Sequence, residues 1–159
     1  MDLDIYFKPI DFSKFKLAPW AQKKYSLASV LEKNQEKLQI EKAKIVIIGI
    51  EEDRNSVVKG SAKAPNVIRE HLYSLNRIST RFKILDLGNV TIGKEVNDSY
   101  FALKDVCETL IQLGKTVVVL GGSQDLTFGL TKAFEDDPFS LVSIDPKIDI
   151  SKGAKKINS

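Results

Sequence analysis

Short apolar runs alternate with amphipathic stretches along most of this chain. Residues 44–50 (KIVIIGI) and 116–120 (TVVVL) are continuous apolar runs, typical of strands buried on both faces of a parallel sheet. Residues 81–90 contain a third strand, closed by Gly88 and Asn89, and residues 139–144 (FSLVSI) form a fourth apolar run. The pattern predicts four strands in a mainly parallel sheet.

Between these runs, apolar positions recur at helical spacing. Residues 20–39 carry such positions among Lys, Glu and Gln, which predicts an amphipathic helix; they are Leu27, Val30, Leu31 and Leu38. A second helix is expected to begin at Pro65 and to bury a stripe made of Ile68, Leu72 and Leu75. A third is predicted before Gly114, a C-cap glycine; its apolar face contains Leu103, Val106, Cys107, Leu110 and Ile111.

This alternation of helices and strands predicts an α/β protein with three layers, in which a mainly parallel sheet has helices on both faces. Residues 1–42 are expected to form an N-terminal arm and amphipathic helix, and residues 43–150 the α/β domain. Residues 151–159 form a basic tail and a candidate truncation point. Because parallel sheets usually contain more strands, we expect the chain to be the front half of a larger fold.

Composition narrows the possible settings and partners. Cys107 is the only cysteine, so an internal disulfide is excluded. The apolar runs are too short to span a membrane and the chain opens with acidic residues rather than a secretory signal, so a cytoplasmic location is expected. The net charge of +3 comes from three lysines in the tail, which contains no acid. Without a concentrated basic face, nucleic-acid binding is not expected.

The turn after residues 116–120 is the first candidate for a site. Gly121 and Gly122 stop the strand where a helix must begin, and ligands of open α/β sheets bind at such strand ends. With Ser123, these glycines are predicted to line the rim of a pocket. Asp53 and Asn55, after the first strand, border the same rim if the strands are parallel, although a solvated loop explains them equally well.

Two aspartates, Asp145 and Asp149, follow the fourth run and would reach this rim too. Ser123 is expected to cap the helix that begins near Asp125, since no histidine base is paired with it for a nucleophilic role. An anion cradle at the glycine turn is disfavoured, because Asp125 would repel phosphate.

Two other residue types with catalytic potential are interpreted as structural. Cys107 lies on an apolar helix face, which favours a packing role over a nucleophilic one. His71, the only histidine, is expected to be solvated or at the edge of the core rather than catalytic.

Five stretches in order resemble the ureohydrolase family, which includes arginase, agmatinase and formimidoylglutamase. They are IVIIGI with its acidic loop, the helix APNVIREHL, LDLGNV, the strand VVVLGG with the turn that follows, and SLVSIDPKID. Together they cover about residues 43–150. The resemblance implies an arginase-like fold and, in the family, a pair of manganese ions that activate a hydroxide.

The same stretches depart from the family where it binds metal. Gln124 stands at the position of the histidine in the family's GGDHS motif, and Lys147 at that of the histidine in DAHxD. Of the family's ligands only Asp145 and Asp149 are retained, and the later SxDxDxxDP motif is absent. An amide is a weak ligand, and a protonated lysine repels a dication. We therefore expect no cofactor in this chain, and Lys147 to lie between Asp145 and Asp149 in place of the metals.

These departures favour a ureohydrolase-like protein that has lost the dimanganese site and has a structural, binding or assembly role. Whether the chain is an enzyme stays open. The alternative is a fragment of an active metal-dependent hydrolase of linear amidines, with guanidino or formimino substrates and further ligands beyond residue 159. An incomplete sheet also leaves an apolar edge, which predicts self-association as a homo-oligomer; the sequence identifies no other protein partner.

Overall fold

The computed structural model describes residues 3–22, 25–33, 40–77, 81–135 and 138–145. Its centre is a five-stranded sheet in the order β1-β4-β3-β5, with β2 also paired to β4. The strands are β1 (Phe7–Lys8), β2 (Glu32–Lys33), β3 (Ile45–Ile50), β4 (Ile84–Val90) and β5 (Thr116–Leu120). Only β1 is antiparallel to its neighbour, so the sheet is mainly parallel.

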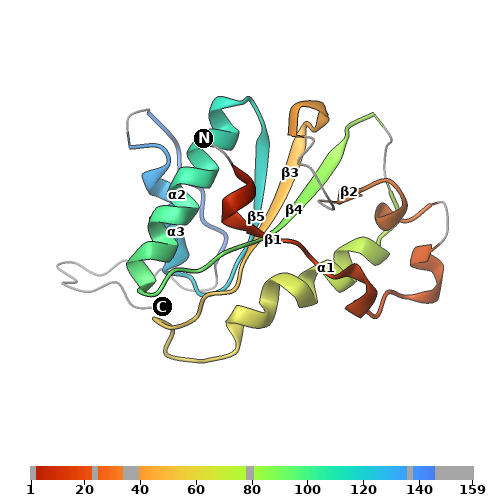
Figure 1. The fold of residues 1–159 in the computed structure, drawn as a ribbon, viewed down its shortest axis with the longest axis horizontal. Helices are drawn as coiled ribbons and strands as arrows, with labels where there is room; N and C mark the ends of the chain where they lie inside the picture. The colour runs from red at the N-terminus through yellow and green to blue at the C-terminus, as the bar shows by residue number, and fades with distance from the viewer. Residues whose placement is uncertain (1–2, 23–24, 34–39, 78–80, 136–137, 146–159) are drawn as a thin grey trace.

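Helices cover both faces of this sheet, which confirms the predicted three-layer α/β fold (Figure 1). They are α1 (Ala64–Ser74), α2 (Val96–Gln112) and α3 (Leu126–Lys132). Two hydrophobic cores separate the layers. One joins α2 and α3 to the sheet through residues such as Leu103, Val106 and Ile48, and the other joins α1 and the N-terminal arm to it through Tyr73, Ile47 and Leu120.

Helix α2 matches its prediction closely. Leu103, Val106, Cys107 and Leu110 are fully buried on its core face. Gly114 adopts the left-handed conformation with φ of +69°, and its N–H donates to the Ile111 carbonyl at 2.8 Å. The Lys115 N–H reaches the Leu110 carbonyl at 3.0 Å, which completes a Schellman motif and ends the helix.

The predicted helix over residues 20–39 is wrong for the part that the structure describes. Short 3-10 turns replace it, η3 (Pro19–Gln22) and η4 (Leu27–Ser29), followed by β2. The physical reason is a set of non-local hydrogen bonds: the Leu27 N–H donates to the Leu75 carbonyl and the Arg77 N–H to the Tyr25 carbonyl, each at 2.8 Å. The backbone of this arm is thereby bonded to the end of α1 instead of to itself.

The remaining 3-10 turns occur in the arm and in the loops before β3 and α1. They are η1 (Leu3–Tyr6), η2 (Phe12–Lys14), η5 (Ile40–Lys42) and η6 (Ser61–Lys63). Among the described residues, no helix is both long and apolar enough to cross a membrane.

Strand β4 continues through the glycine that was predicted to close it. Its register against β3 shifts between Ile47, which pairs with Asp86, and Ile48, which pairs with Gly88, so Leu87 forms a β-bulge. Gly88 has φ of +98°, and a Cβ there would lie 2.5 Å from the Lys8 carbonyl oxygen. The bulge lets β4 continue to Val90 and pair with β1.

Two further expectations are corrected. The buried face of α1 consists of Pro65, Arg69 and Tyr73, whereas Ile68 and Leu75 of the predicted stripe are exposed. Residues 139–144 form no strand: they lie outside the sheet, with Val142 82% and Ile144 98% exposed.

Candidate functional site

The loops that follow β3, β4 and β5 meet at the carboxyl end of the sheet, as predicted for parallel strands. Glu52, in the loop after β3, is the residue that joins them. Its carboxylate accepts from the Ser99 hydroxyl of α2 at 2.8 Å, and its carbonyl oxygen accepts from the Ser123 N–H at 2.9 Å. Because Glu52 is almost fully buried, these bonds fix the loop after β3 against α2 and against the turn after β5.

The charge of Glu52 is balanced by Arg54. The Arg54 Nε lies 3.0 Å from Oε1 and 3.1 Å from Oε2 of Glu52, and the Arg54 backbone N–H lies 2.8 Å from Oε1. Burial alone would raise the pKa of Glu52, but the bonds from Arg54 and Ser99 outweigh it and hold the pKa below the ordinary value. The pairing with Glu52 raises the pKa of Arg54. A charged, hydrogen-bonded pair therefore lies beneath the rim.

Gly122 is required by this arrangement. A Cβ on Gly122 would lie 2.0 Å from the carbonyl oxygen of Glu52, whereas one on Gly121 would meet nothing within 4 Å. The Ser123 hydroxyl donates to the same carbonyl at 3.2 Å, and the first residue before α3, Asp125, makes no side-chain capping bond. The predicted cap is therefore wrong: Ser123 ties the turn to the β3 loop, and its N–H is engaged there too, which disfavours an anion cradle.

The two predicted rim residues after β3, Asp53 and Asn55, contact different parts of the molecule. Asp53 folds back on its own loop, where its Oδ2 accepts from the N–H groups of Gly60 at 2.7 Å and Ala62 at 3.3 Å. These backbone bonds lower the pKa of Asp53. Asn55 instead faces α2 and the glycine turn, since its Nδ2 donates to the Tyr100 hydroxyl at 3.3 Å and to Asp125 Oδ2 at 3.4 Å.

Asp125 and Tyr100 form a buried polar contact at this rim. The Tyr100 hydroxyl donates to Asp125 Oδ2, and both side chains are at least nine-tenths buried. Burial and the neighbouring carboxylate raise the pKa of Tyr100 to about 12, so the phenol keeps its proton at neutral pH. The contact connects the start of α3 to α2.

Gln124 and Asp145 are brought together even though residues 139–144 form no strand. The Gln124 Nε2 donates to Asp145 Oδ2 at 3.2 Å in an exposed position. The predicted positions Lys147 and Asp149 lie outside the described residues. Within the residues that the structure does describe, no group of three His, Cys, Asp or Glu side chains is placed to hold a metal ion. The Gln124 amide directs an N–H donor at the Asp145 carboxylate, whereas a metal site needs further acceptor atoms. These two residues therefore do not by themselves fit a manganese site.

A buried network between α1 and β4 was missed by sequence reasoning. Arg69 is fully buried and binds Asp86 through Nε at 2.8 Å and Nη2 at 3.0 Å, and Nη2 also reaches the Gly88 carbonyl at 3.0 Å. The Tyr73 hydroxyl donates to the same carboxylate, and burial together with Asp86 raises the pKa of Tyr73. Arg69 and Asp86 both lie in stretches of the sequence that resemble the ureohydrolase family. This resemblance was the sequence signal that could have pointed to them.

Two residues with catalytic potential lie away from the rim contacts. Cys107 is fully buried, and this burial raises the pKa of its thiol to about 12, which confirms its assignment to the core. His71 is exposed on α1, in agreement with a solvated histidine.

The layers, strand order and polar strand ends define an α/β protein of the arginase type. The family described as the arginase family matches residues 43–158, and this chain belongs to that family. Among curated relatives, the formimidoylglutamase of Salmonella paratyphi C is 28% identical over 116 residues, which cover 67% of this chain and 37% of the relative. That of Enterobacter sp. (strain 638) is 26% identical over 115 residues, with the same shares covered.

Solved structures give the same result. Trypanosoma cruzi formiminoglutamase with Mn²⁺ superposes with a TM-score of 0.60 at 25% identity, over 69% of this chain and 39% of that one. The agmatine ureohydrolase of Thermoplasma volcanium, at 24% identity and a TM-score of 0.58 over 70% of this chain and 39% of that one, shares the fold. The chain thus spans about two fifths of the length of the relatives it matches.

Proposed function

We propose that this chain is a non-catalytic member of the arginase family that has lost the dimanganese site and has a structural, binding or assembly role. The contact between Gln124 and Asp145 carries the proposal. The amide that replaces the family's histidine donates to the carboxylate that resembles a family ligand, 3.2 Å away. A hydrogen bond of this kind occupies a carboxylate oxygen that would otherwise be available to a cation.

The charge of Lys147 supports the same proposal. Its ammonium is protonated at neutral pH unless it is strongly buried, and a cation next to Asp145 and Asp149 in the sequence opposes binding of a dication. Without a metal to lower the pKa of water, the chain has no evident source of hydroxide at neutral pH. Hydrolysis of a C–N bond by these residues is therefore not expected.

Manganese content tests the proposal directly. After incubation with Mn²⁺ and desalting, elemental analysis of the wild-type protein should show much less than one manganese per chain. The double variant Gln124→His, Lys147→His restores two family ligands and should retain more manganese. Gln112→His adds an exposed histidine on α2 and serves as the matched control. Stoichiometric manganese in the wild-type protein would overturn the proposal.

A second candidate, part of an active hydrolase of linear amidines, is favoured by the coverage of the relatives. The chain spans 37% of the length of the Salmonella formimidoylglutamase, so a longer protein could contribute further ligands. This candidate predicts manganese-dependent release of urea from arginine or agmatine, or of formamide from formiminoglutamate, by the full-length protein. The non-catalytic proposal predicts no release above a sample without protein.

A further inference from the structure

The amino ends of the parallel strands form a basic surface that the order of residues along the chain does not show. Lys83 precedes β4, Lys44 precedes β3 and Lys115 precedes β5. The three strands begin in register, because Ile45 at the start of β3 pairs with the first residue of β4 and with the first residue of β5. The three lysines therefore lie side by side, in the order of the strands in the sheet.

Backbone hydrogen bonds extend this register to the lysines themselves. The Lys44 N–H donates to the Lys83 carbonyl at 3.0 Å, and the Lys44 carbonyl accepts from the Thr116 N–H at 3.0 Å. Since neighbouring strands lie about 4.8 Å apart, the row from Lys83 to Lys115 crosses about 10 Å of the end of the sheet. The backbone of the sheet thus sets the spacing of the row.

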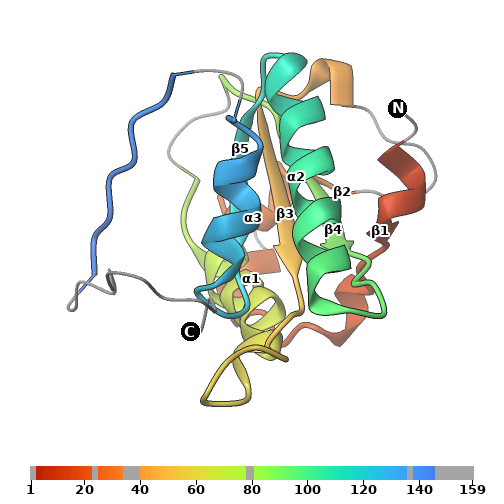
Figure 2. The ribbon, with the colours of Figure 1, turned by 90° about the vertical axis from the view of Figure 1, so that its left-hand side faces the viewer.

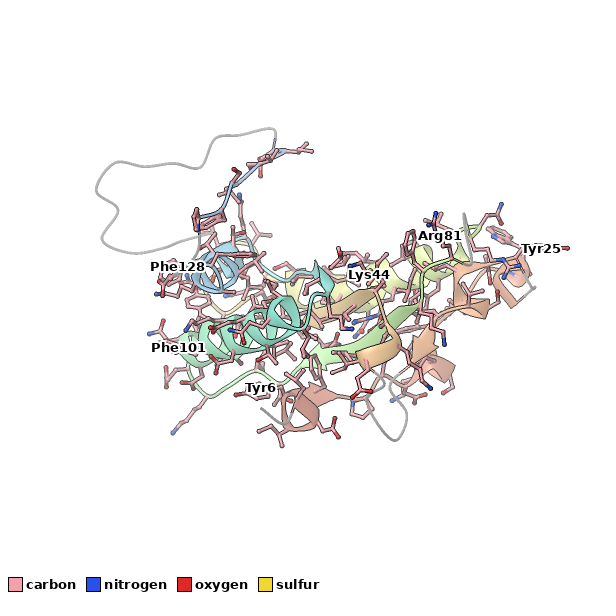
Figure 3. The ribbon with its side chains drawn as sticks, turned by 90° about the horizontal axis from the view of Figure 1, so that it is seen from above. Tyr6, Tyr25, Lys44, Arg81, Phe101 and Phe128 are labelled. Atoms are coloured by element: carbon pink, nitrogen blue, oxygen red, sulfur yellow. The ribbon has the colours of Figure 1, made fainter. Side chains whose placement is uncertain are left out.

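These lysines belong to a larger cationic surface, here called the basic end and defined by residues 40–45, 81–84 and 112–117. It contains one acid, Glu41, and five cations, which are Lys42, Lys44, Arg81, Lys83 and Lys115. All five cations except the half-buried Lys115 are exposed. Figure 2 shows that α2 ends where β3 begins, and in Figure 3 Lys44 and Arg81 lie toward the same end of the sheet, away from the labelled phenylalanines of α2 and α3.

Helix capping accounts for only part of this charge. The Lys44 Nζ lies 3.5 Å from the Gly114 carbonyl oxygen at the end of α2, and the Lys115 Nζ lies 3.2 Å from the Glu41 carbonyl oxygen and 3.0 Å from that of Ala43. Carbonyl groups are neutral, and the carboxyl end of a helix carries about half of one negative charge. The charge of these two lysines therefore remains largely uncompensated by the contacts that they make.

The residue types of the basic end indicate the kind of partner. Four of its five cations are lysines, which are compact point charges, whereas phosphate and nucleic-acid sites favour the forked guanidinium group of arginine. Its one arginine, Arg81, lies over the ring of Phe82 at 5.8 Å, where a nucleic-acid base would otherwise stack. Phe82 is 52% exposed and Leu113 53%, so apolar surface lies among the cations. A peptide with acidic and apolar side chains fits this combination.

We propose that the basic end is a docking surface for an acidic segment of a partner protein. Carboxylates of that segment pair with Lys44, Lys83 and Lys115, and its apolar side chains cover Phe82 and Leu113. The surface lies at the amino ends of the strands, opposite the rim. The proposal rests on the binding role proposed above, to which it adds a surface and a class of partner.

Fluorescence anisotropy with a short fluorescein-labelled oligoglutamate peptide tests docking on the wild-type protein. The peptide should bind at low salt, and raising the ionic strength from about 0.05 M to about 0.5 M should weaken binding at least about tenfold, because mobile ions screen the lysines. A labelled oligodeoxythymidylate of the same length should bind more weakly. Absence of peptide binding at low salt, or tighter binding of the oligodeoxythymidylate, would overturn the proposal.

Matched charge reversals locate the surface. Lys44→Glu, Lys83→Glu should weaken peptide binding at least about tenfold, because two attractions become repulsions. Lys63→Glu, Lys94→Glu makes the same change in net charge at exposed lysines before α1 and α2, at the opposite end of the sheet, and should weaken binding less than about twofold. Equal weakening by the two double variants would show a general attraction between charges and would overturn the proposal.

Neutral substitutions cover the case in which the reversed charges disturb the fold. Lys44→Gln, Lys83→Gln removes both charges without adding carboxylates at the end of α2, and it should weaken peptide binding at least about threefold. Unchanged binding by this variant would overturn the proposal. These measurements require no metal, whereas manganese content tests the loss of the dimanganese site, so the two proposals can fail separately.

Discussion

At the scale of single residues, the rim depends on how closely backbones approach. Gly121 and Gly122 are neighbours with negative φ, yet only Gly122 lies against another loop, the carbonyl of Glu52. A side chain at Gly122 would collide with backbone atoms of the β3 loop. Unlike the end of a flexible side chain, this backbone cannot move aside without shifting the loop. The two positions therefore form a matched pair for measuring the cost of separating the β3 and β5 loops.

Gly122→Ala should lower the free energy of unfolding by about 1–3 kcal/mol, because the new Cβ collides with the Glu52 carbonyl and breaks the bonds from Ser123. Gly121→Ala should be neutral or stabilising by up to about 1 kcal/mol, since its Cβ meets no atom and the unfolded chain loses freedom. Urea unfolding followed by circular dichroism measures both. A loss for Gly121→Ala as large as that for Gly122→Ala would contradict the close-approach argument.

At the scale of elements, the Arg69 and Asp86 pair joins α1 to β4 across a layer boundary. The two side chains are fully buried, so each charge depends on the other and on the polar atoms around them. Gly49 leaves room for this pair, because a Cβ there would lie 2.1 Å from Asn89 Oδ1 and 2.7 Å from Arg69 Nη1. The network thereby fixes how α1 packs on the sheet.

Arg69→Met should lower the free energy of unfolding by about 3–5 kcal/mol, since it leaves the Asp86 carboxylate buried without its cation. The double variant Arg69→Met, Asp86→Leu removes both charges and should recover a measurable part of that loss. Glu108→Gln, in the partly exposed ion pair with Lys104, is the control and should change stability by at most about 0.5 kcal/mol. A double variant no more stable than Arg69→Met would show that packing, not the unpaired charge, dominates.

The link between the β3 loop and α2 should make stability depend on pH. The pKa of Glu52 is held below its ordinary value of 4.5, so its contribution is fully present above that value and disappears as the pH falls through the lower folded-state pKa. At neutral pH, Glu52→Gln should cost about 1–2 kcal/mol, a figure reduced for the 37% exposure of the Arg54 side chain.

Urea unfolding of wild type and Glu52→Gln from about pH 7 to about pH 3.5 checks this expectation. The difference between the two proteins should narrow as the pH falls below 4.5. Comparison with the variant is needed because Asp11, Asp53 and Glu135 also have lowered pKa values and add to the acid sensitivity of both proteins. A constant difference would mean that Glu52 stabilises through shape rather than charge.

The elements that local sequence determines were predictable, and those that depend on distant partners were not. Strands β3, β4 and β5 form at the three runs that predict them, although only Leu120 of β5 is buried, and α2 has both an apolar stripe and a glycine cap. The buried face of α1 was mispredicted because Arg69 is compensated by Asp86, which lies on another element. The same limit applies to the site: the glycine turn marks the rim, but the role of Glu52 depends on residues of α2 and of the turn after β5 that no local pattern reveals.

At the scale of the whole molecule, the two cores share the sheet and lie on its opposite faces, so we expect most of the structure to unfold as one cooperative unit. Cys107, on α2, belongs to the larger core and is fully buried. Its thiol is protonated because burial raises its pKa to about 12. The predicted self-association through the open sheet edge stays a prediction, which light scattering of the purified protein measures.

Cys107 should therefore react with a thiol reagent such as Ellman's reagent only when the molecule unfolds, because both burial and the raised pKa suppress attack by the native thiol. If unfolding and refolding are fast relative to the reaction, the rate follows the unfolded population. A loss of about 1–3 kcal/mol in Gly122→Ala should then accelerate labelling by about 5- to 150-fold, with Gly121→Ala as the control that should not accelerate it. Rapid labelling of the wild-type protein in the absence of denaturant would contradict the burial of Cys107 and the expectation of one cooperative unfolding unit.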